Sequence, residues 1–392
     1  MIAAIFAAKL NNQVILLEKN EKLGKKIYIT GKGRCNLSNN VEPIDFLNNV
    51  TTNSKFIFSS IFRFTPSDVI DFFTENGLKL KTERGNRVFP ESDKASDVTK
   101  TLEKLLKTYN VDVRLNHEVI DVLVSDGKVS SVVVNDYKID CDKVIVCTGG
   151  VSYPFTGSTG DGYTFAKKLG HKIIPPKPSL VGIELKGSDY KPLQGLSLKN
   201  VEISCFSGEK RIFCDFGEML FTHFGVSGPI VLSASSHLNK LDVGKCTIKI
   251  DLKPALDCNV LNDRLIREIK EANTKSIATV IRSLMPASLV EVVLKKAGVS
   301  DRVKACELTA KQRDKLVFTI KNLSFECLKL RDIKEAIITS GGVDVSQINP
   351  KTMESKIVSG LYFAGEVIDV DAYTGGFNMQ IAFSTGYVAG NS

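Results

Sequence analysis

The chain has 392 residues, of which 43% are hydrophobic and 24% charged, and its formal net charge is +8. This length predicts two or three domains with ample core, and the composition excludes a disordered or fibrous chain. No apolar run approaches the roughly 20 residues of a membrane span, and no export signal opens the chain. We therefore expect a cytoplasmic protein that does not contact a membrane.

The first residues match part of a dinucleotide-binding unit. Residues 1–9 (MIAAIFAAK) have helical spacing, and residues 14–18 (VILLE) predict a buried strand that ends on Glu18. In such a unit this acid accepts hydrogen bonds from a ribose, although a lone acid at a strand end is more often simply solvated. The unit normally opens with a strand and G-x-G-x-x-G. Because residues 1–10 begin inside that motif, we expect a truncated or misplaced start and weak dinucleotide binding by this form. The alternative is a short N-terminal helix in an unrelated fold.

Glycine-rich and acidic segments follow in the first half of the chain. Residues 24–36 are GKKIYITGKGRCN, and residues 87–97 are RVFPESDKASD. Residues 144–150 (VIVCTGG) predict a buried strand before a turn, and residues 152–163 (SYPFTGSTGDGY) predict a glycine-rich turn into a helix. Singly, each is more often an ordinary turn than a ligand contact. Their order along the chain makes them informative together.

The middle of the chain changes character from about residue 186. Short strands precede a helical stretch from about 260 to 321, which Pro286 and Gly298 interrupt. Residues 186–340 hold 25 Lys or Arg against 18 Asp or Glu, a net of +7. This excess suggests an anionic partner or substrate. However, the basic residues alternate with acids, as on an ordinary solvated surface, and no nucleic-acid-binding motif accompanies them. RNA binding is therefore the minority interpretation.

One histidine of the middle region is a candidate for proton transfer. His223 lies in residues 218–231 (EMLFTHFGVSGPIV). A histidine titrates near neutral pH and can move a proton to or from a substrate. A structural histidine at a turn is at least as common, and a helix that starts near Pro229 would explain much of the segment.

The nine cysteines show no C-x-x-C or other metal-ligand spacing, so the sequence predicts no metal site. An odd number in a chain without an export signal indicates free thiols. Cys35 alone is placed near a candidate ligand loop. A small buried residue is more common at such a position than a reactive thiol.

The last long segment is the most informative. Residues 359–386 are SGLYFAGEVIDVDAYTGGFNMQIAFSTG. Residues 361–364 predict a buried strand, and Gly375-Gly376 lets the backbone approach a ligand closely before a helix over 377–387. The N-terminus of that helix would stabilise negative charge on the ligand. The segment therefore predicts a ligand-binding junction.

Together these segments resemble the BaiN/YhiN-like family of bacterial FAD-dependent flavoproteins (NAD(P)/FAD-dependent oxidoreductases, the aminoacetone oxidase family). More distantly they resemble fumarate-reductase-type flavoproteins. The shared patterns are GKK...GxGRCN, RVFPxSDKASDV, LFTH[FY]GxSGP and GExxDVDxxTGG[YF]NxQxA, and Ala372 stands where the family usually has glycine. The match from Val14 onward covers almost the whole chain.

The resemblance implies an α/β fold, with a three-layer Rossmann-like FAD-binding domain and a parallel sheet, interrupted by an inserted β-barrel-like subdomain with a helical bundle. The first part of the FAD-binding domain would span 1–185 and its C-terminal part 341–392. The inserted substrate domain would span 186–340, being β-rich over about 186–255 and 323–340 and helical over about 256–322.

The resemblance also implies non-covalently bound FAD and hydride transfer through flavin N5 to or from an unidentified small organic substrate. No second G-x-G-x-x-G is visible, so NAD(P)H would dock only transiently as donor. The catalytic candidates are His223 and Cys35. The residues implied to bind FAD are Glu18, Lys26, Gly31, Gly33, Arg34, Cys35, Asn36, Thr148, Gly149, Gly150, Gly365, Glu366, Asp369, Gly375, Gly376, Phe377 and Asn378.

Three hypotheses remain open at this point. The first is an active FAD-dependent oxidoreductase. The second is a truncated, cofactor-free remnant that binds a partner. The third is an FAD-dependent RNA-modifying enzyme. The sequence predicts no oligomeric state.

Overall fold

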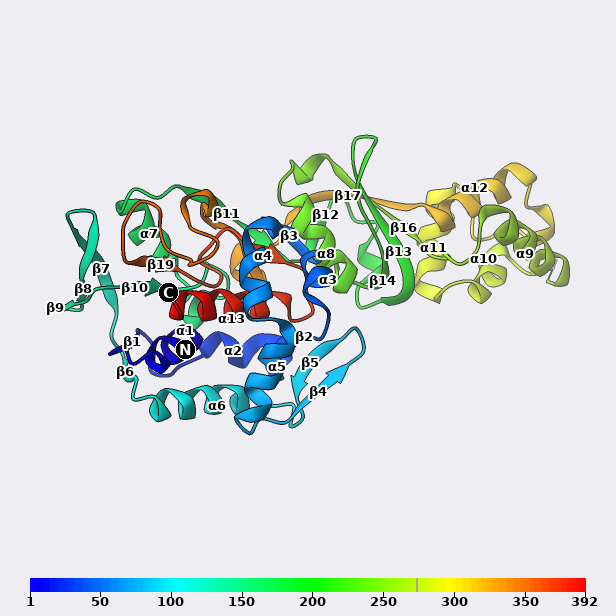
Figure 1. Cartoon of the computed structure of the whole chain (residues 1–392). Coiled ribbons are helices and arrows are strands. Elements are labelled where there is room, and N and C mark those ends of the chain that lie inside the picture. Colours follow the sequence, from blue (N-terminus) through cyan, green and yellow to red (C-terminus); the bar gives the residue numbers. More distant parts are fainter. Residues whose placement is uncertain (273) are drawn as a thin grey trace. The chain divides into compact units, whose positions relative to one another are not determined.

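The computed structural model describes residues 1–272 and 274–392, and the chain divides into two compact units (Figure 1). Unit 1 comprises Met1–Ser179 and Ile333–Ser392, and unit 2 comprises Leu180–Asp332. The sequence predicts these boundaries at about 186 and 340. Both boundaries lie a few residues earlier in the structure, because β18 (Ile338–Val343) pairs antiparallel with β11 (Ile173–Ser179) inside unit 1 and does not join the inserted barrel.

Two parallel strand pairs lie at the centre of unit 1. β1 (Ile15–Glu18) pairs with β6 (Asp112–Leu115), and β10 (Val144–Val146) pairs with β19 (Leu361–Phe363). All three residues of β19 are buried, as expected for a strand covered on both faces. The parallel pairing confirms the predicted Rossmann-like class, although the two pairs form separate sheets in the described part of the chain.

Helices pack around these strands. α5 (Pro66–Glu75) begins with a capping box in which Thr65 and Asp68 satisfy each other's backbone N–H groups. The final helix, α13 (Phe377–Gly390), is largely buried. The remaining elements of unit 1 are α1 (Ile2–Lys9), α2 (Lys25–Ile29), α3 (Pro43–Leu47), α4 (Ser54–Arg63), α6 (Ala95–Thr108), α7 (Asp161–Lys168), β2 (Ser38–Asn39), β3 (Val50–Thr52), β4 (Leu80–Glu83), β5 (Arg87–Pro90), β7 (Val119–Ser125), β8 (Lys128–Val134), β9 (Tyr137–Asp140) and β20 (Asp371–Ala372).

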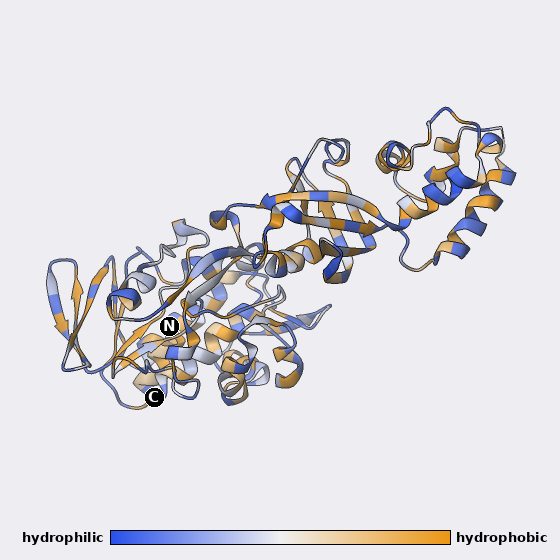
Figure 2. Ribbon diagram, turned by 90° about the horizontal axis from the view of Figure 1, so that it is seen from above, coloured by the Kyte–Doolittle hydropathy of each residue, from blue (hydrophilic) through white to orange (hydrophobic). Residues whose placement is uncertain are grey.

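Unit 2 contains a closed barrel whose strands follow the order β12-β15-β14-β13-β16-β17. Buried and half-buried residues alternate along β16, and Figure 2 shows the matching alternation of hydropathy along the barrel strands. One face of each strand therefore fills the barrel. The strands and the helix beside them are β12 (Ile183–Leu185), β13 (Ser197–Ser207), β14 (Lys210–Phe221), β15 (Gly225–Ser227), β16 (Cys246–Asp251), β17 (Leu323–Leu330) and α8 (Pro229–Leu238).

A helical bundle is inserted between β16 and β17. It consists of α9 (Cys258–Glu271), α10 (Ile277–Val280), α11 (Ala287–Ala297) and α12 (Ala310–Lys321). Pro286 and Gly298, the two predicted interruptions, are the N-cap and the left-handed C-cap of α11. The barrel and bundle confirm the predicted insert. No helix among the described residues has both the length and the apolar character needed to cross a membrane.

Candidate functional site

The loop between β19 and α13 is held tightly by a segment from the start of the chain. Gly375 and Gly376 adopt φ of 125° and 100°, which side-chain-bearing residues rarely adopt. Asn39 Nδ2 donates to Gly375 O at 2.9 Å. A Cβ on Gly376 would overlap the carbonyl of Ser38 and lie 2.8 Å from Asn36 Oδ1. Glycine is therefore required here, and the predicted residues Asn36, Gly375 and Gly376 come together.

No side chain among the described residues caps α13, whose N-cap is Gly376. Asn378 instead fixes the loop, since its Oδ1 accepts from Ala372 N at 2.9 Å and its Nδ2 donates to Ala372 O at 2.8 Å. Phe377 turns into the core, with its ring centroid 5.1 Å from that of Phe46. The uncapped N–H groups and the helix dipole together favour an electron-rich ligand atom.

Two buried amide oxygens beside this turn lack partners among the described residues. They are Asn36 Oδ1 and Asn39 Oδ1. Leaving a buried acceptor unsatisfied costs about 1–3 kcal/mol. Unpaired acceptors beside uncapped N–H groups match the mixed donor and acceptor edge of a flavin ring. The signal in the sequence was the GRCN motif for Asn36, whereas Asn39 was missed.

A second group of predicted residues meets around Glu366. Lys26 Nζ donates to Glu366 Oε2 and, at 2.8 Å, to Ser152 Oγ. Glu366 Oε1 accepts from Thr339 N at 2.8 Å and from Ser152 Oγ at 3.1 Å. A Cβ on Gly150 would overlap Thr339 Oγ1 and lie 3.3 Å from Glu366 Oε1. The side chains of Lys26 and Glu366 therefore form one polar cluster, and the backbone of Gly150 packs against it. Ser152 and Thr339 also belong to it, although no motif had marked them as site residues.

The segment after β10 and the first turn of α7 hold further unsatisfied polar atoms. Thr148 Oγ1 and Tyr163 OH are buried and have no partner among the described residues. Burial, followed by the charges of Glu366 and Asp369, raises the pKa of Tyr163. Gly149 has φ of 74°, and a Cβ on it would lie 2.9 Å from Ser158 Oγ. Thr148 and Gly149 directly precede Gly150 of the Glu366 cluster in the chain.

The remaining predicted residues of the N-terminal loop are engaged within the protein. Glu18 Oε1 accepts from Asn20 N at 2.9 Å and from Asn20 Nδ2 at 2.6 Å. Arg34 pairs with Glu83 and, at 2.6 Å, with Asp93. These pairs hold Arg34 against the β4–β5 hairpin. Three glycines of the predicted set, Gly31, Gly33 and Gly365, have φ of 56°, 85° and 77°.

The Cys35 side chain is fully buried, and its φ is 59°. Burial raises the pKa of its thiol to about 12. The side chain therefore stays protonated at neutral pH, which favours a packing role over that of a nucleophile.

Two buried carboxylates occupy the loop before α13. Asp369 is 9% exposed and Asp371 is fully buried. Asn53 Nδ2 donates to Asp369 Oδ2 at 3.0 Å, and burial, opposed by this bond, raises the pKa of Asp369. Asp371 accepts hydroxyl hydrogen bonds, each 3.0 Å long, from Ser179, Ser340 and Thr51. Asp371 therefore ties the loop to β11, β18 and β3.

His223 belongs to unit 2, at the turn between β14 and β15. Its side chain is exposed, and its ring makes an edge contact with Phe224, with centroids 5.1 Å apart. The other candidate site residues all belong to unit 1. His223 therefore belongs to a different unit from the other candidate site residues, and its proton-transfer role stays a prediction.

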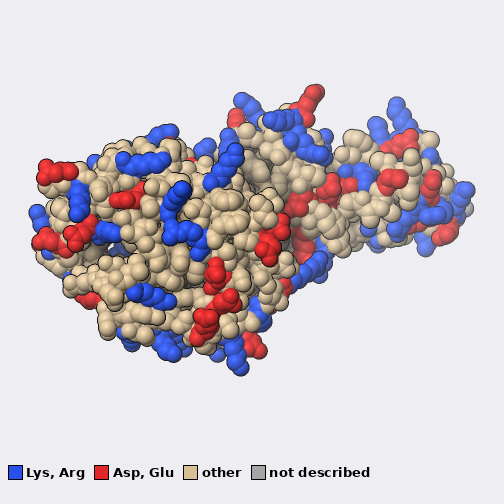
Figure 3. Space-filling model, in the orientation of Figure 1, with Lys and Arg blue, Asp and Glu red and all other residues tan. Residues whose placement is uncertain are grey.

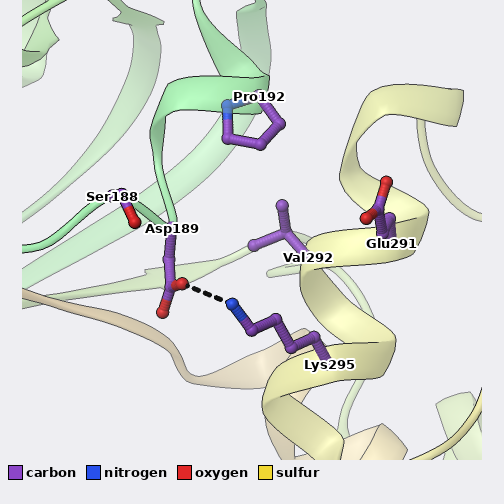
Figure 4. A pocket seen from close by; sticks show the side chains of 6 residues that line it. All are labelled: Ser188, Asp189, Pro192, Glu291, Val292 and Lys295. Atoms are coloured by element: carbon purple, nitrogen blue, oxygen red, sulfur yellow. Dashed lines mark hydrogen bonds and ion pairs between the residues drawn. The ribbon is translucent and has the colours of Figure 1, made fainter.

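A small cavity in unit 2 is lined by none of these residues (Figure 4). Its volume is about 190 Å³, which is below the several hundred Å³ typical of cofactor sites. Lys295 Nζ lies 2.9 Å from Asp189 Oδ1 across it, linking α11 to the loop after β12. The cavity lies between the barrel and the helical bundle of unit 2. No group of His, Cys, Asp and Glu among the described residues is arranged to hold a metal ion.

Comparison with known proteins identifies the class. A flavocytochrome c3 fumarate reductase in its open conformation shares the fold with a TM-score of 0.53 at 17% identity, covering 100% of this chain and 75% of that one. This likeness shows the fold. Together with the family and the relatives that follow, it places the chain among the flavin-dependent oxidoreductases. The family described as HI0933-like protein Rossmann domain matches residues 1–392, and the chain belongs to this family.

Two relatives match along nearly their whole length. A protein from Haemophilus influenzae named ribosomal RNA dihydrouridine synthase is 33% identical over 397 residues, covering 99% of this chain and 94% of the relative. A 3-dehydro-bile acid delta(4,6)-reductase from Clostridium scindens is 29% identical over 396 residues, covering 100% of this chain and 96% of the relative. The expected resemblance is confirmed.

Proposed function

We propose that this protein is an FAD-dependent reductase that adds two hydrogens to a carbon–carbon double bond conjugated with a carbonyl group. The names of the two relatives support this reaction class, because both describe saturation of such a bond in a ring, one in a uracil base and one in a 3-oxo steroid acid. With NAD(P)H as donor the balance is substrate plus NAD(P)H plus H⁺ giving reduced substrate plus NAD(P)⁺.

We propose further that the substrate is a uracil base in ribosomal RNA. The observation that favours RNA over a bile acid is the 33% identity to the relative named ribosomal RNA dihydrouridine synthase. The charge of unit 2 is compatible with it, because residues 180–332 hold 24 Lys or Arg against 18 Asp or Glu. A polyanion gains from this net of +6, whereas a small acid with one carboxylate gains little. The bile-acid-like substrate remains the second candidate, supported by the 29% identity.

The residues of unit 1 fit FAD in distinct roles. When bound, FAD would supply hydride transfer to one carbon of the substrate. The uncapped N–H groups of α13 and the oxygens of Asn36 and Asn39 would hold the polar edge of the ring system. Glu366, fixed by Lys26, would accept hydrogen bonds from the hydroxyls of the cofactor chain, and Glu18 from a ribose.

The second carbon of the substrate requires a proton, for which we propose His223. His223→Ala should slow turnover and leave flavin content unchanged, because the side chain is exposed and lies in unit 2. Equal turnover in variant and wild type would return His223 to a structural role.

The substrate assignment is tested with the purified full chain supplied with FAD and NADPH. One reaction contains a ribosomal RNA fragment with unpaired uridines, and the other contains a 3-oxo-4,6-diene bile acid. Mass spectrometry should find a gain of two hydrogens on a uridine and none on the steroid. Reduction of the steroid alone would select the second candidate, and reduction of neither would refute the proposed reaction.

A further inference from the structure

The outer face of α12 combines two lysines with a phenylalanine that the bundle core does not use. Lys311, Lys315 and Phe318 are spaced i, i+4 and i+7, so they lie along one face of the helix. All three are exposed, Phe318 to 62%. The buried side of the same helix carries Leu316 and Ile320. We call Lys311, Lys315 and Phe318 the α12 face.

The stretch of chain that contains α12 carries an excess of positive charge. Residues 302–321 hold six Lys or Arg against two acids, a net of +4 that is half of the formal charge of the chain. Lys321 is used structurally, since its Nζ lies 2.6 Å from Asp251 Oδ2. Asp314 is the one acid of α12 and shares the exposed side. Neither Lys311 nor Lys315 forms an ion pair among the described residues, and Figure 3 shows Lys and Arg side chains interspersed with Asp and Glu over the bundle surface.

We propose that the α12 face binds a single-stranded segment of RNA, with Lys311 and Lys315 on phosphates and Phe318 stacked on an unpaired base. This inference rests on the proposed function. Cations alone describe an ordinary solvated helix. An exposed aromatic ring one turn beyond two lysines is what binding of unstacked bases requires, because every nucleotide offers the π-face of its base to a ring and its phosphate to a cation.

The apolar surface of the bundle is too small for a protein partner. Among the described residues 258–272 and 274–321, the exposed large hydrophobic side chains are Val260 on α9 and Phe318 on α12. Protein interfaces have a continuous apolar centre and bury roughly 800 Å² on each partner. A single exposed ring next to two lysines matches a base and its phosphates better.

The test measures binding of the full chain to a fluorescent single-stranded ribosomal RNA fragment by anisotropy over a range of salt concentrations. Phe318→Ala should weaken binding about 5- to 150-fold, the range for loss of one stacked base. The double variant K311Q/K315Q should lower the slope of log K against log salt by about 1.4, since each phosphate contact contributes about 0.7 for single strands.

Matched controls come from elsewhere on the surface. Phe216 on β14 is 56% exposed, and Phe216→Ala removes an exposed ring outside the α12 face. K104Q/K107Q removes two exposed lysines of α6 in unit 1. Both controls should bind as wild type does, and circular dichroism should show all variants folded, because every substituted side chain is exposed.

Each outcome decides the proposal. Losses confined to the α12 variants support it. If these variants bind as the controls do while wild type binds RNA, the α12 face is not the RNA contact, and the proposed function stands. If wild type does not bind RNA, both the α12 proposal and the RNA assignment fail. A wild-type dimer that Phe318→Ala dissociates would assign the face to a second copy of the chain instead.

Discussion

Replacing Gly376 with alanine should weaken both the fold of unit 1 and its hold on flavin. The added Cβ lowers the stability of the fold in two ways. A residue with a side chain at φ of 100° costs about 1–2 kcal/mol. The overlap with the Ser38 carbonyl forces a backbone shift that costs about 1–3 kcal/mol, as overpacking does. The sum of about 2–5 kcal/mol is a large part of the 5–15 kcal/mol that stabilises a typical domain.

A second glycine separates the two costs. Gly77 has φ of 90°, but a Cβ on it meets nothing within 4 Å. Gly77→Ala should therefore lose only the conformational part. Thermal unfolding should place Gly376→Ala about 2–12 °C below Gly77→Ala, at about 2–4 °C per kcal/mol for this size.

Flavin content measures the second effect, because the backbone shift moves the first turn of α13 away from its position beside Asn36. Gly376→Ala should retain less flavin than Gly77→Ala, or retain it with a lowered reduction potential, because the partial positive charge of the helix N-terminus favours reduced flavin. The reasoning is refuted if the two variants have the same melting temperature, flavin content and potential.

Three further predictions follow from buried polar groups. Asp371→Asn should lower the free energy of unfolding by about 1–3 kcal/mol in urea denaturation, because the amide nitrogen cannot accept the hydroxyl hydrogen bonds that the carboxylate accepts; an unchanged midpoint would contradict this. His171 is 3% exposed, and burial lowers its pKa, so the stability present above its unfolded pKa of about 6.5 should be lost as the pH falls below that value. His171→Gln should flatten this decline in melting temperature, and a parallel decline would argue against the assignment. Cys35 should resist alkylation at neutral pH in the native protein while the exposed Cys258 and Cys306 react; rapid labelling of Cys35 would show that the thiol is accessible.

Much of the architecture could be predicted from local patterns. The capping box at Thr65 and Asp68 and the interruptions at Pro286 and Gly298 act through neighbouring residues, so the sequence shows them directly. The boundaries of the inserted unit were predicted less well. They depend on whether residues 338–343 pair with β11 or with the barrel. An apolar strand pattern does not show which other strand it pairs with.

The sequence by itself determined the class of this protein, because turns that need glycine and strands that need apolar runs leave a chemical pattern in chain order. It marked Asn36, Gly376 and Glu366 as site residues. Only the tertiary structure decided which other groups meet them. Asn39 and Thr339 reach the site from segments whose local sequence has no special character. Arg34 forms an ion pair with Glu83, and Asp371 accepts hydrogen bonds from three hydroxyl groups on three strands. Hydrogen bonds and ion pairs of this kind join residues far apart in the chain, and the physical reason is that their partners are selected by burial and geometry after the elements have packed.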